Sequence, residues 1–378
     1  MKPATGGALR HVLTHLLTPL LMCVGMGLAY LGAFAHPSPH QLPVAVVGEA
    51  PAARVLAQTI GDKADGRLAV RTVADRAEAV RRLEARDVFG AYVPDRHHPE
   101  LLVASAGSDT TAMAVQKVFT PVAARQGAPL KVTDIVPPAE GDPTGQGVFF
   151  LLVALSIGSY ASVAVIGGAG GALPMRLRAA LAAGMSLVVA VIGAAFAGPV
   201  FHLVDHGLWG LWGMAWLYSA GILLVGTGLH TFLKRWTTLG VMVLFVMLNF
   251  TSAGGVYRPE LQNGFFAALH SFWNGAGFVE GVRSLVYFGH AGLGRNVTTL
   301  AVWLAAGVAT VAAAWAVERR RATRPAATVA PAAGAEEAEE AEEAEEAEEE
   351  MEEAEEEMEE AEEEMEEAEE EMEEAVGV

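Results

Sequence analysis

The sequence predicts an α-helical polytopic membrane protein with six transmembrane helices, a small α/β domain between the first and second helices, and an acidic tail that is disordered or weakly helical. Three observations support this fold class. Six mostly apolar stretches have the length of about 20 residues that a helix needs to cross a membrane. A polar segment of domain size separates the first two stretches. The negative charge is concentrated in one terminal segment.

Charge divides the chain into two parts. The 378 residues have a formal net charge of −20, but the segment 336–374 holds 28 glutamates and no Lys or Arg. The rest of the chain has 17 acidic residues against 25 basic ones, a net charge of +8. The chain as a whole is therefore not an acidic soluble protein. The single cysteine, Cys23, lies in an apolar run, so a disulfide framework and a thiolate metal site are both excluded.

Six apolar stretches carry the membrane prediction. Their repeated length, and the basic residues between them, are atypical of short helices buried in a soluble core. They contain almost no ionisable side chain except histidines near their ends, such as His202 and His230. An ion-coupled transporter is therefore disfavoured, because such proteins keep ionisable ligands within the bilayer. The stretches lie near 12–35, 147–169, 180–204, 208–230, 236–256 and 297–317.

The Lys and Arg residues of the short loops predict the orientation, because such residues are concentrated on the cytoplasmic side. If all six stretches span, these groups share one side, and the chain is a multi-pass plasma-membrane protein with both termini in the cytoplasm. Arg258, Arg283 and Arg295 are exceptions, in a connector long enough to weaken the rule. The groups on the common side are Lys2 and Arg10, Arg176 and Arg178, Lys234 and Arg235, and Arg319, Arg320, Arg321 and Arg324.

The N-terminal segment 1–36 is interpreted as an uncleaved membrane anchor. The alternative is a cleaved signal peptide, because Ala33-Phe34-Ala35 resembles a small-residue cleavage site before His36. The apolar run is longer than the roughly 7 to 15 residues of a signal peptide, which favours the anchor.

Residues 37–145 are expected to form a small extracytoplasmic α/β domain. Short β-branched runs alternate there with segments of helical periodicity, which is typical of βαβ units. Pro137-Pro138 and Gly141-Asp142-Pro143 then form a stiff linker to the second span. Strands are expected at 43–48, 67–73, 88–94, 101–106 and 130–136, and helices at 50–63, 75–86 and 110–125.

The five-helix membrane domain, residues 146–320, contains an unusual connector, the outer hairpin at 254–295. It is too long for a simple turn and too apolar for an ordinary loop. Two short amphipathic helices are expected to lie in the outer interface, with Trp273 and Tyr287 at headgroup depth. The alternative is a re-entrant hairpin that caps a translocation path, with Glu280 and Arg283 as an ion pair on one helix face.

Residues 321–378 form a linker and a Glu-rich, low-complexity tail. Heptads place Met351, Met358, Met365 and Met372 seven apart with Ala three residues later, which is the spacing of a narrow coiled-coil seam. The other positions are Glu and repel one another, so a fluctuating helix or coil without self-association is expected. The tail is interpreted as a slippage repeat. The alternative is a cytoplasmic polyanion that attracts basic partners or divalent cations.

No catalytic, cofactor or metal site is expected. None of the five lysines follows the Gly-rich spacing of a phosphate-binding loop, so energy from ATP would have to come through a partner. No Ser/His/Asp or Cys/His set forms a recognisable motif, which argues against an enzyme. His97 and His98, near Asp95 and Glu100, point apart on a strand, which disfavours a metal site. A nucleic-acid partner is not expected.

The segment 254–288 contains, in order, Gly-Gly, Pro-Glu-Leu, Phe-Phe-Ala, Phe-Trp, Gly-Ala-Gly and Tyr-Phe. With its anchor, insert and five further spans, the chain resembles the type-2 ABC exporter permeases, especially the branch resembling the YhgE/Pip membrane proteins of Gram-positive bacteria. The resemblance implies a homodimeric or paired permease that moves an apolar, lipidic, drug-like or envelope substrate outward, energised by a separate ATP-binding subunit. It also implies that the loop with Pro174, Arg176 and Arg178 docks on that subunit. The rival hypothesis is a non-transporting scaffold or surface receptor whose α/β domain binds a partner.

Overall fold

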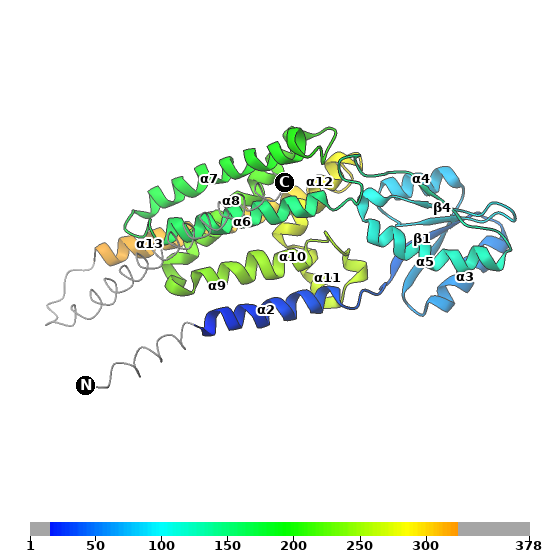
Figure 1. Ribbon diagram of the computed structural model, residues 1–378, viewed down its shortest axis with the longest axis horizontal. Helices are drawn as coiled ribbons and strands as arrows, with labels where there is room; N and C mark the ends of the chain where they lie inside the picture. The colour runs from blue at the N-terminus through cyan, green and yellow to red at the C-terminus, as the bar shows by residue number, and fades with distance from the viewer. Residues whose placement is uncertain (1–15, 324–378) are drawn as a thin grey trace, which may run out of the picture. The chain divides into compact units, whose positions relative to one another are not determined.

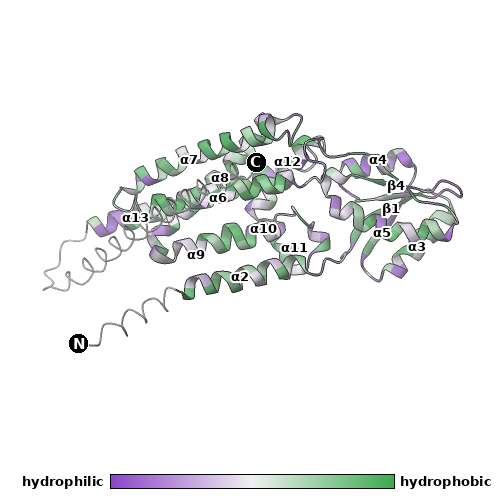
Figure 2. Cartoon of the chain, in the orientation of Figure 1, coloured by the Kyte–Doolittle hydropathy of each residue, from purple (hydrophilic) through white to green (hydrophobic). Residues whose placement is uncertain are grey.

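The computed structural model describes residues 16–323, and most of them are helical. Five helices in this part of the chain are long and apolar enough to cross a membrane, as a polytopic helical membrane protein requires. Hydrophobic residues follow one another along these helices in Figure 2, whereas the sheet-containing part alternates between hydrophobic and hydrophilic residues. The five are α2 (Leu17–Phe34), α6 (Gly147–Gly167), α7 (Met175–Ala195, extended by η2, Phe196–Val200), α8 (Leu208–Leu233) and α13 (Leu293–Ala322).

The apolar helix that forms within the stretch expected at 236–256 is shorter than the helices that form in the other five stretches. A 3₁₀ turn, η3 (Lys234–Trp236), leads into α9 (Thr237–Met242), the π-helical turn η4 (Val243–Met247) and α10 (Leu248–Ser252). The continuous apolar helix Thr237–Ser252 therefore falls below the length of the five candidate spans. By length and composition, five of the six expected stretches qualify as spans.

Two details of the chain differ from expectation or lie outside the described residues. Helix α7 begins at Met175, so Arg176 and Arg178 lie in its first turn instead of in a loop. The residues Lys2, Arg10 and Arg324, and the Glu-rich tail with its Met heptads, fall outside the residues that the structure describes.

A five-stranded sheet forms between α2 and α6, in the order β2-β1-β3-β4-β5. Its neighbours are parallel except β3 and β4, which are antiparallel. Each expected strand and helix of this segment is present, with its ends displaced by at most a few residues. The elements are β1 (Leu42–Val47), α3 (Pro51–Ala64), β2 (Leu68–Val73), α4 (Arg76–Glu84), β3 (Ala91–Val93), β4 (Glu100–Val103), η1 (Ser105–Gly107), α5 (Asp109–Arg125) and β5 (Lys131–Asp134).

Helices cover both faces of this sheet (Figure 1). Alternate residues of β1 point to opposite faces, as the pleat of a strand requires. Val44 and Val46 pack in one cluster with residues of α3 and α5, whereas Ala45 and Val47 pack in a second cluster with residues of α4. Helices α3 and α5 therefore lie on the same face and α4 on the other, and residues of α3 and α5 line a cavity on their common face.

The remaining helices form a bundle around α8, the most buried of the candidate spans. Helices α6, α7 and α12 (Asn274–Val286) pack on α8, and glycines allow close approach where α8 meets α13. A Cβ atom at Gly228 would meet Thr310, and one at Gly307 would meet Leu224 at 2.8 Å. Short helices η5 (Pro259–Leu261) and α11 (Gly264–His270) connect α10 with α12.

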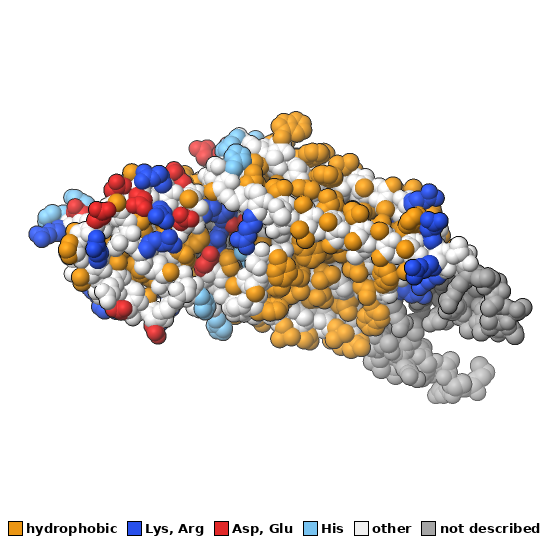
Figure 3. Space-filling view, turned by 180° about the vertical axis from the view of Figure 1, so that it is seen from behind, with side chains coloured by type: hydrophobic (Ala, Val, Ile, Leu, Met, Phe, Trp, Pro, Cys, Tyr) orange, Lys and Arg blue, Asp and Glu red, His pale blue; other side chains and the backbone are white. Residues whose placement is uncertain are grey.

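The surface of the bundle is predominantly apolar. Figure 3 shows hydrophobic side chains over the helical part, Lys and Arg at one end of it, and mixed charges over the sheet-containing part. Exposed large apolar residues are numerous on the outward faces of the candidate spans, including Leu28 at 73% and Val191 at 56% exposure. An apolar surface of this extent between two polar ends matches a lipid environment better than water.

Candidate functional site

Four charged side chains meet where α12 contacts the α/β domain, and we name them the Glu280 cluster. The Glu280 carboxylate accepts hydrogen bonds from Nη1 of Arg258, at 3.1 and 3.2 Å, and from Nη1 of Arg283, at 3.1 Å. It also accepts one from Nη2 of Arg86. The residues come from α12, from the segment before η5, and from the turn after α4. Glu280 thus joins three segments that are far apart in the sequence.

The Glu280 cluster is buried. The exposed fractions of Glu280, Arg258 and Arg283 are 6%, 7% and 1%. Burial alone acts to raise the pKa of the Glu280 carboxyl, but attraction by Arg258, Arg86 and Arg283 outweighs burial and holds the pKa well below its usual range. Glu260 adds a second carboxylate, 3.3 Å from Nε of Arg258. Three guanidinium groups therefore depend on two carboxylates for neutralisation.

Backbone and aromatic groups complete the surroundings of these arginines. Arg283 donates to the carbonyl oxygens of Gly254, at 2.8 Å, and Gly255, at 3.4 Å. Gly254 has a φ of 75°, which glycine adopts more readily than other residues. The guanidinium of Arg258 lies 4.5 Å from the ring centroid of Phe89, a cation–π contact with the α/β domain. The cluster is thus held by hydrogen bonds and by stacking.

A cavity of about 340 Å³ adjoins the Glu280 cluster. Its lining includes the charged groups of Arg258, Glu260 and Arg295, and the imidazole of His270. His270 Nδ1 lies 2.9 Å from the carbonyl oxygen of Ser252, and burial lowers the pKa of His270. The cavity thus has both charged and apolar residues in its lining, which come mainly from the connector and α13 and include Arg86 of the α/β domain.

Sequence reasoning found part of this site. The ion pair of Glu280 and Arg283, which the alternative interpretation of the outer hairpin included, is present in the structure. Arg86 was missed because nothing in its local sequence distinguishes it from neighbouring surface arginines. Arg258 did leave a signal, since it is an exception to the one-sided distribution of basic residues. In the structure Arg258 pairs with the buried carboxylate of Glu280.

The expected placement of the outer hairpin in an interface is wrong for α12. Nearly every residue of α12 is buried in protein, because small residues such as Gly275 and Gly281 let the helix pack against the bundle. Trp273 is 6% exposed and donates from Nε1 to the carbonyl oxygen of Leu244 at 3.1 Å. Tyr287 is half-buried, and its hydroxyl donates to the carbonyl oxygen of Leu203 at 3.3 Å. Both aromatic residues are packing residues of the protein.

The expected ATPase-coupling residues are divided in the structure. Pro174 and Arg176 are exposed at the start of α7. Arg178, in contrast, is 5% exposed and forms an ion pair with Glu318 of α13. Its Nε also donates to the carbonyl oxygen of Leu173 at 3.1 Å. Arg178 therefore stabilises the start of α7 through contacts within the protein, and its guanidinium is not exposed to a partner. This corrects its expected role in docking an ATP-binding subunit.

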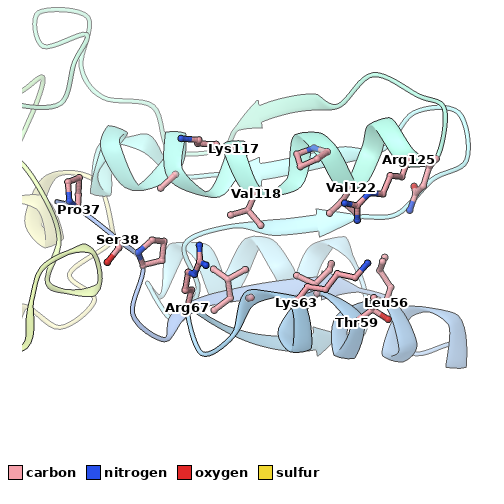
Figure 4. A pocket seen from close by; sticks show the side chains of 17 residues that line it. Pro37, Ser38, Leu56, Thr59, Lys63, Arg67, Lys117, Val118, Val122 and Arg125 are labelled. Atoms are coloured by element: carbon pink, nitrogen blue, oxygen red, sulfur yellow. The ribbon is translucent and has the colours of Figure 1, made fainter.

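A second candidate site is the crevice between α3 and α5, a cavity of about 660 Å³ that we name the basic groove (Figure 4). Its walls include Leu56, Val118 and Val122. Lys63, Arg67, Lys117 and Arg125 also line it, and among residues 16–323 no Asp or Glu does. Figure 4 shows Lys117 and Arg125 on the α5 side and Lys63 and Arg67 on the opposite side. The groove therefore combines an apolar interior with a positive rim.

The described residues contain no group of three or more His, Cys, Asp or Glu side chains that could hold a metal ion. Asp95 instead caps a turn, and its Oδ1 accepts from the backbone N–H groups of His97 and His98, both at 2.8 Å. These two bonds lower the pKa of Asp95.

Comparison with protein-family models, with curated proteins and with solved structures finds no match for this chain. Its function therefore has to be inferred from its own residues.

Proposed function

We propose that this chain is the membrane-spanning permease subunit of an exporter of the ABC-2 type. A separate ATP-binding subunit supplies the energy, and an apolar, lipidic, drug-like or envelope substrate moves outward. The proposal includes a paired or homodimeric arrangement in the plasma membrane, an extracytoplasmic α/β domain and cytoplasmic termini. It requires six crossings, so Thr237–Ser252 has to span with its flanking turns. Its 16 residues would extend about 24 Å as a regular helix.

The main support for the proposal is the turn before α7, residues 168–174, which an ion pair at the start of α7 stabilises. Pro174 and Arg176 are exposed, whereas the buried ion pair of Arg178 and Glu318 fixes the start of α7 to the end of α13. Because this exposed turn is fixed to α7 and α13, a movement of a subunit docked on it can displace both helices. The Glu280 cluster joins α12 to the α/β domain, so the same movement can reach that domain.

Co-purification from native membranes tests the proposal. We expect the wild-type chain, crosslinked and solubilised, to recover an ATP-binding subunit, and we expect Arg176→Glu to lose it. Arg54→Glu is the matched control, because Arg54 is also an exposed arginine and lies on α3, away from the start of α7. Recovery of no ATP-binding subunit with the wild type, or equal recovery with Arg176→Glu, would overturn the proposal.

The second candidate function is a non-transporting scaffold or surface receptor. The basic groove favours it, because an apolar crevice with a charged rim suits ligand binding without transport. A receptor would keep its activity in Arg176→Glu and lose it when the groove is altered. The two candidate functions therefore respond to different variants.

A further inference from the structure

The basic groove exposes apolar side chains at the edge of the core that packs on the sheet. Helix α5 buries Val115 and Phe119 against the sheet. A second stripe on the same helix, with Val118 and Val122 four residues apart, lines the groove and remains only half-buried. Half-buried Leu56 contributes to the opposite wall, from α3. Apolar surface left uncovered in this way is typical of a binding site.

The cations of the groove have no local partner. In the stretch 16–323, no carboxylate forms an ion pair with Lys63, Arg67, Lys117 or Arg125, although other cations of the domain are paired. The segment 37–145 carries 12 basic and 13 acidic residues, so the domain as a whole is not basic. The positive charge of the groove is therefore a local feature, complementary to an anionic ligand.

One end of the groove lies close to a candidate membrane span. Pro37 and Ser38 line the groove and follow the end of α2, at Phe34, by three and four residues. An extended chain of three residues reaches at most about 11 Å. The backbone N–H of Ser38 donates to the carbonyl oxygen of Leu261 at 3.1 Å, which holds this segment against the connector. The groove therefore begins near the level at which α2 would leave a bilayer.

We propose that the basic groove binds an anionic phospholipid or lysophospholipid drawn from the adjacent membrane leaflet. One acyl chain lies along the apolar interior, and the phosphate headgroup is bound by the rim cations. An acyl chain suits this site because the groove lies between two helices and offers no strand edge to a peptide backbone. The cavity of about 660 Å³ is within the usual size of small-molecule sites.

Photolabelling of the full-length protein in phosphatidylcholine nanodiscs tests this proposal. The probe is lysophosphatidylglycerol with a diazirine in its acyl chain, and the comparison probe is the matched lysophosphatidylcholine. We expect the anionic probe, but not the zwitterionic one, to label saturably the peptides that contain α3 and α5. Labelling of α7, which exposes Val191 to lipid, should be equal for both probes and serves as the internal control.

Charge reversal on the rim is the first variant. Lys63→Glu with Arg125→Glu should weaken the labelling of α3 and α5 at least about 30-fold, since loss of the two cations alone removes about 1 kcal/mol each towards an anionic lipid and 1.4 kcal/mol is tenfold. Arg54→Glu with Arg96→Glu is the matched control and should leave it unchanged, because both arginines are exposed outside the groove. Val118→Trp, which fills the groove without changing its charge, should also abolish labelling.

Several results would overturn the proposal. These are equal labelling by the zwitterionic probe, labelling confined to the membrane helices, insensitivity to the rim and Val118→Trp variants, or a site that takes an acidic peptide and excludes the lipid. The proposal does not depend on export. Arg176→Glu should leave groove labelling intact, so failure of the ATPase test and failure of the lipid test are distinguishable.

Discussion

Removing the charge of Glu280 should destabilise the protein more than any other single carboxylate change in the connector. Glu280→Gln keeps the shape of the side chain but withdraws the carboxylate that three buried or half-buried arginines share. Arg283, at 1% exposure, would keep the carbonyl oxygens of Gly254 and Gly255 and at most one neutral amide oxygen of the new side chain as acceptors, with no carboxylate to balance its charge. Arg86 would keep the hydroxyl of Ser284, at 3.3 Å.

The expected cost follows from this burial. Removing one partner of a buried ion pair typically costs about 3–5 kcal/mol, because it leaves an uncompensated buried charge. Glu280 has several partners, so we expect the upper part of this range. A loss of about 5 kcal/mol corresponds to a fall of roughly 10–20 °C in the melting temperature, at about 2–4 °C per kcal/mol for chains of a few hundred residues.

Thermal unfolding of the detergent-purified protein, followed by tryptophan fluorescence, measures this fall. Glu260→Gln is the matched control, because Glu260 is 24% exposed and contacts Arg258, which keeps Glu280 as a partner. We expect the control to cost about 1 kcal/mol or less. If Glu280→Gln lowers the melting temperature no further than Glu260→Gln, the Glu280 cluster does not stabilise the fold in the way described.

Acid should act on the same group. The pKa of Glu280 is held well below its usual range in the folded protein, so its ion pairs stabilise the fold fully above the unfolded pKa of about 4.3. This stabilisation is lost as the pH falls from there towards the lower folded pKa. The wild-type melting temperature should therefore fall more steeply below about pH 5 than that of Glu280→Gln. Parallel slopes for the two proteins would contradict this assignment.

Two further predictions concern packing. Arg178→Met should lower the free energy of unfolding by about 1–3 kcal/mol. This is less than the loss of a fully buried pair, because Glu318 is 29% exposed and can be hydrated. A melting temperature equal to that of the wild type would show that the ion pair of Arg178 and Glu318 does not stabilise the protein. Gly255→Ala should lower the free energy of unfolding by about 1–3 kcal/mol, because its Cβ would overlap the ring of Phe149. Gly213→Ala is the control: it lies in α8 next to open space, so the substitution should raise the free energy of unfolding by about 0.5–1 kcal/mol. Equal melting temperatures for the two alanine variants would show that Gly255 is not closely packed.

The regular elements of the chain were predictable because local sequence determines them. The β-branched run of β1 and the period of α5 are properties of short segments, and the apolar length of α6 is sufficient to identify it as a candidate span. The same local reasoning was wrong for α12. Its hydrophobic and polar faces predicted an interfacial helix, but polar residues such as Glu280 found buried partners that the local sequence does not show.

The two candidate sites show where sequence reasoning ends. The sequence by itself determined the positions of five candidate spans, the α/β segment and the separation of charge, and it offered one ion pair between residues three apart within an alternative interpretation. Only the tertiary structure decided that Arg86 and Arg258 reach Glu280, that Arg178 is buried against Glu318, and that α3 and α5 lie side by side with their cations facing one groove. The physical reason is that periodicity and length are properties of neighbouring residues, whereas the neutralisation of a buried charge depends on groups brought together from distant parts of the chain.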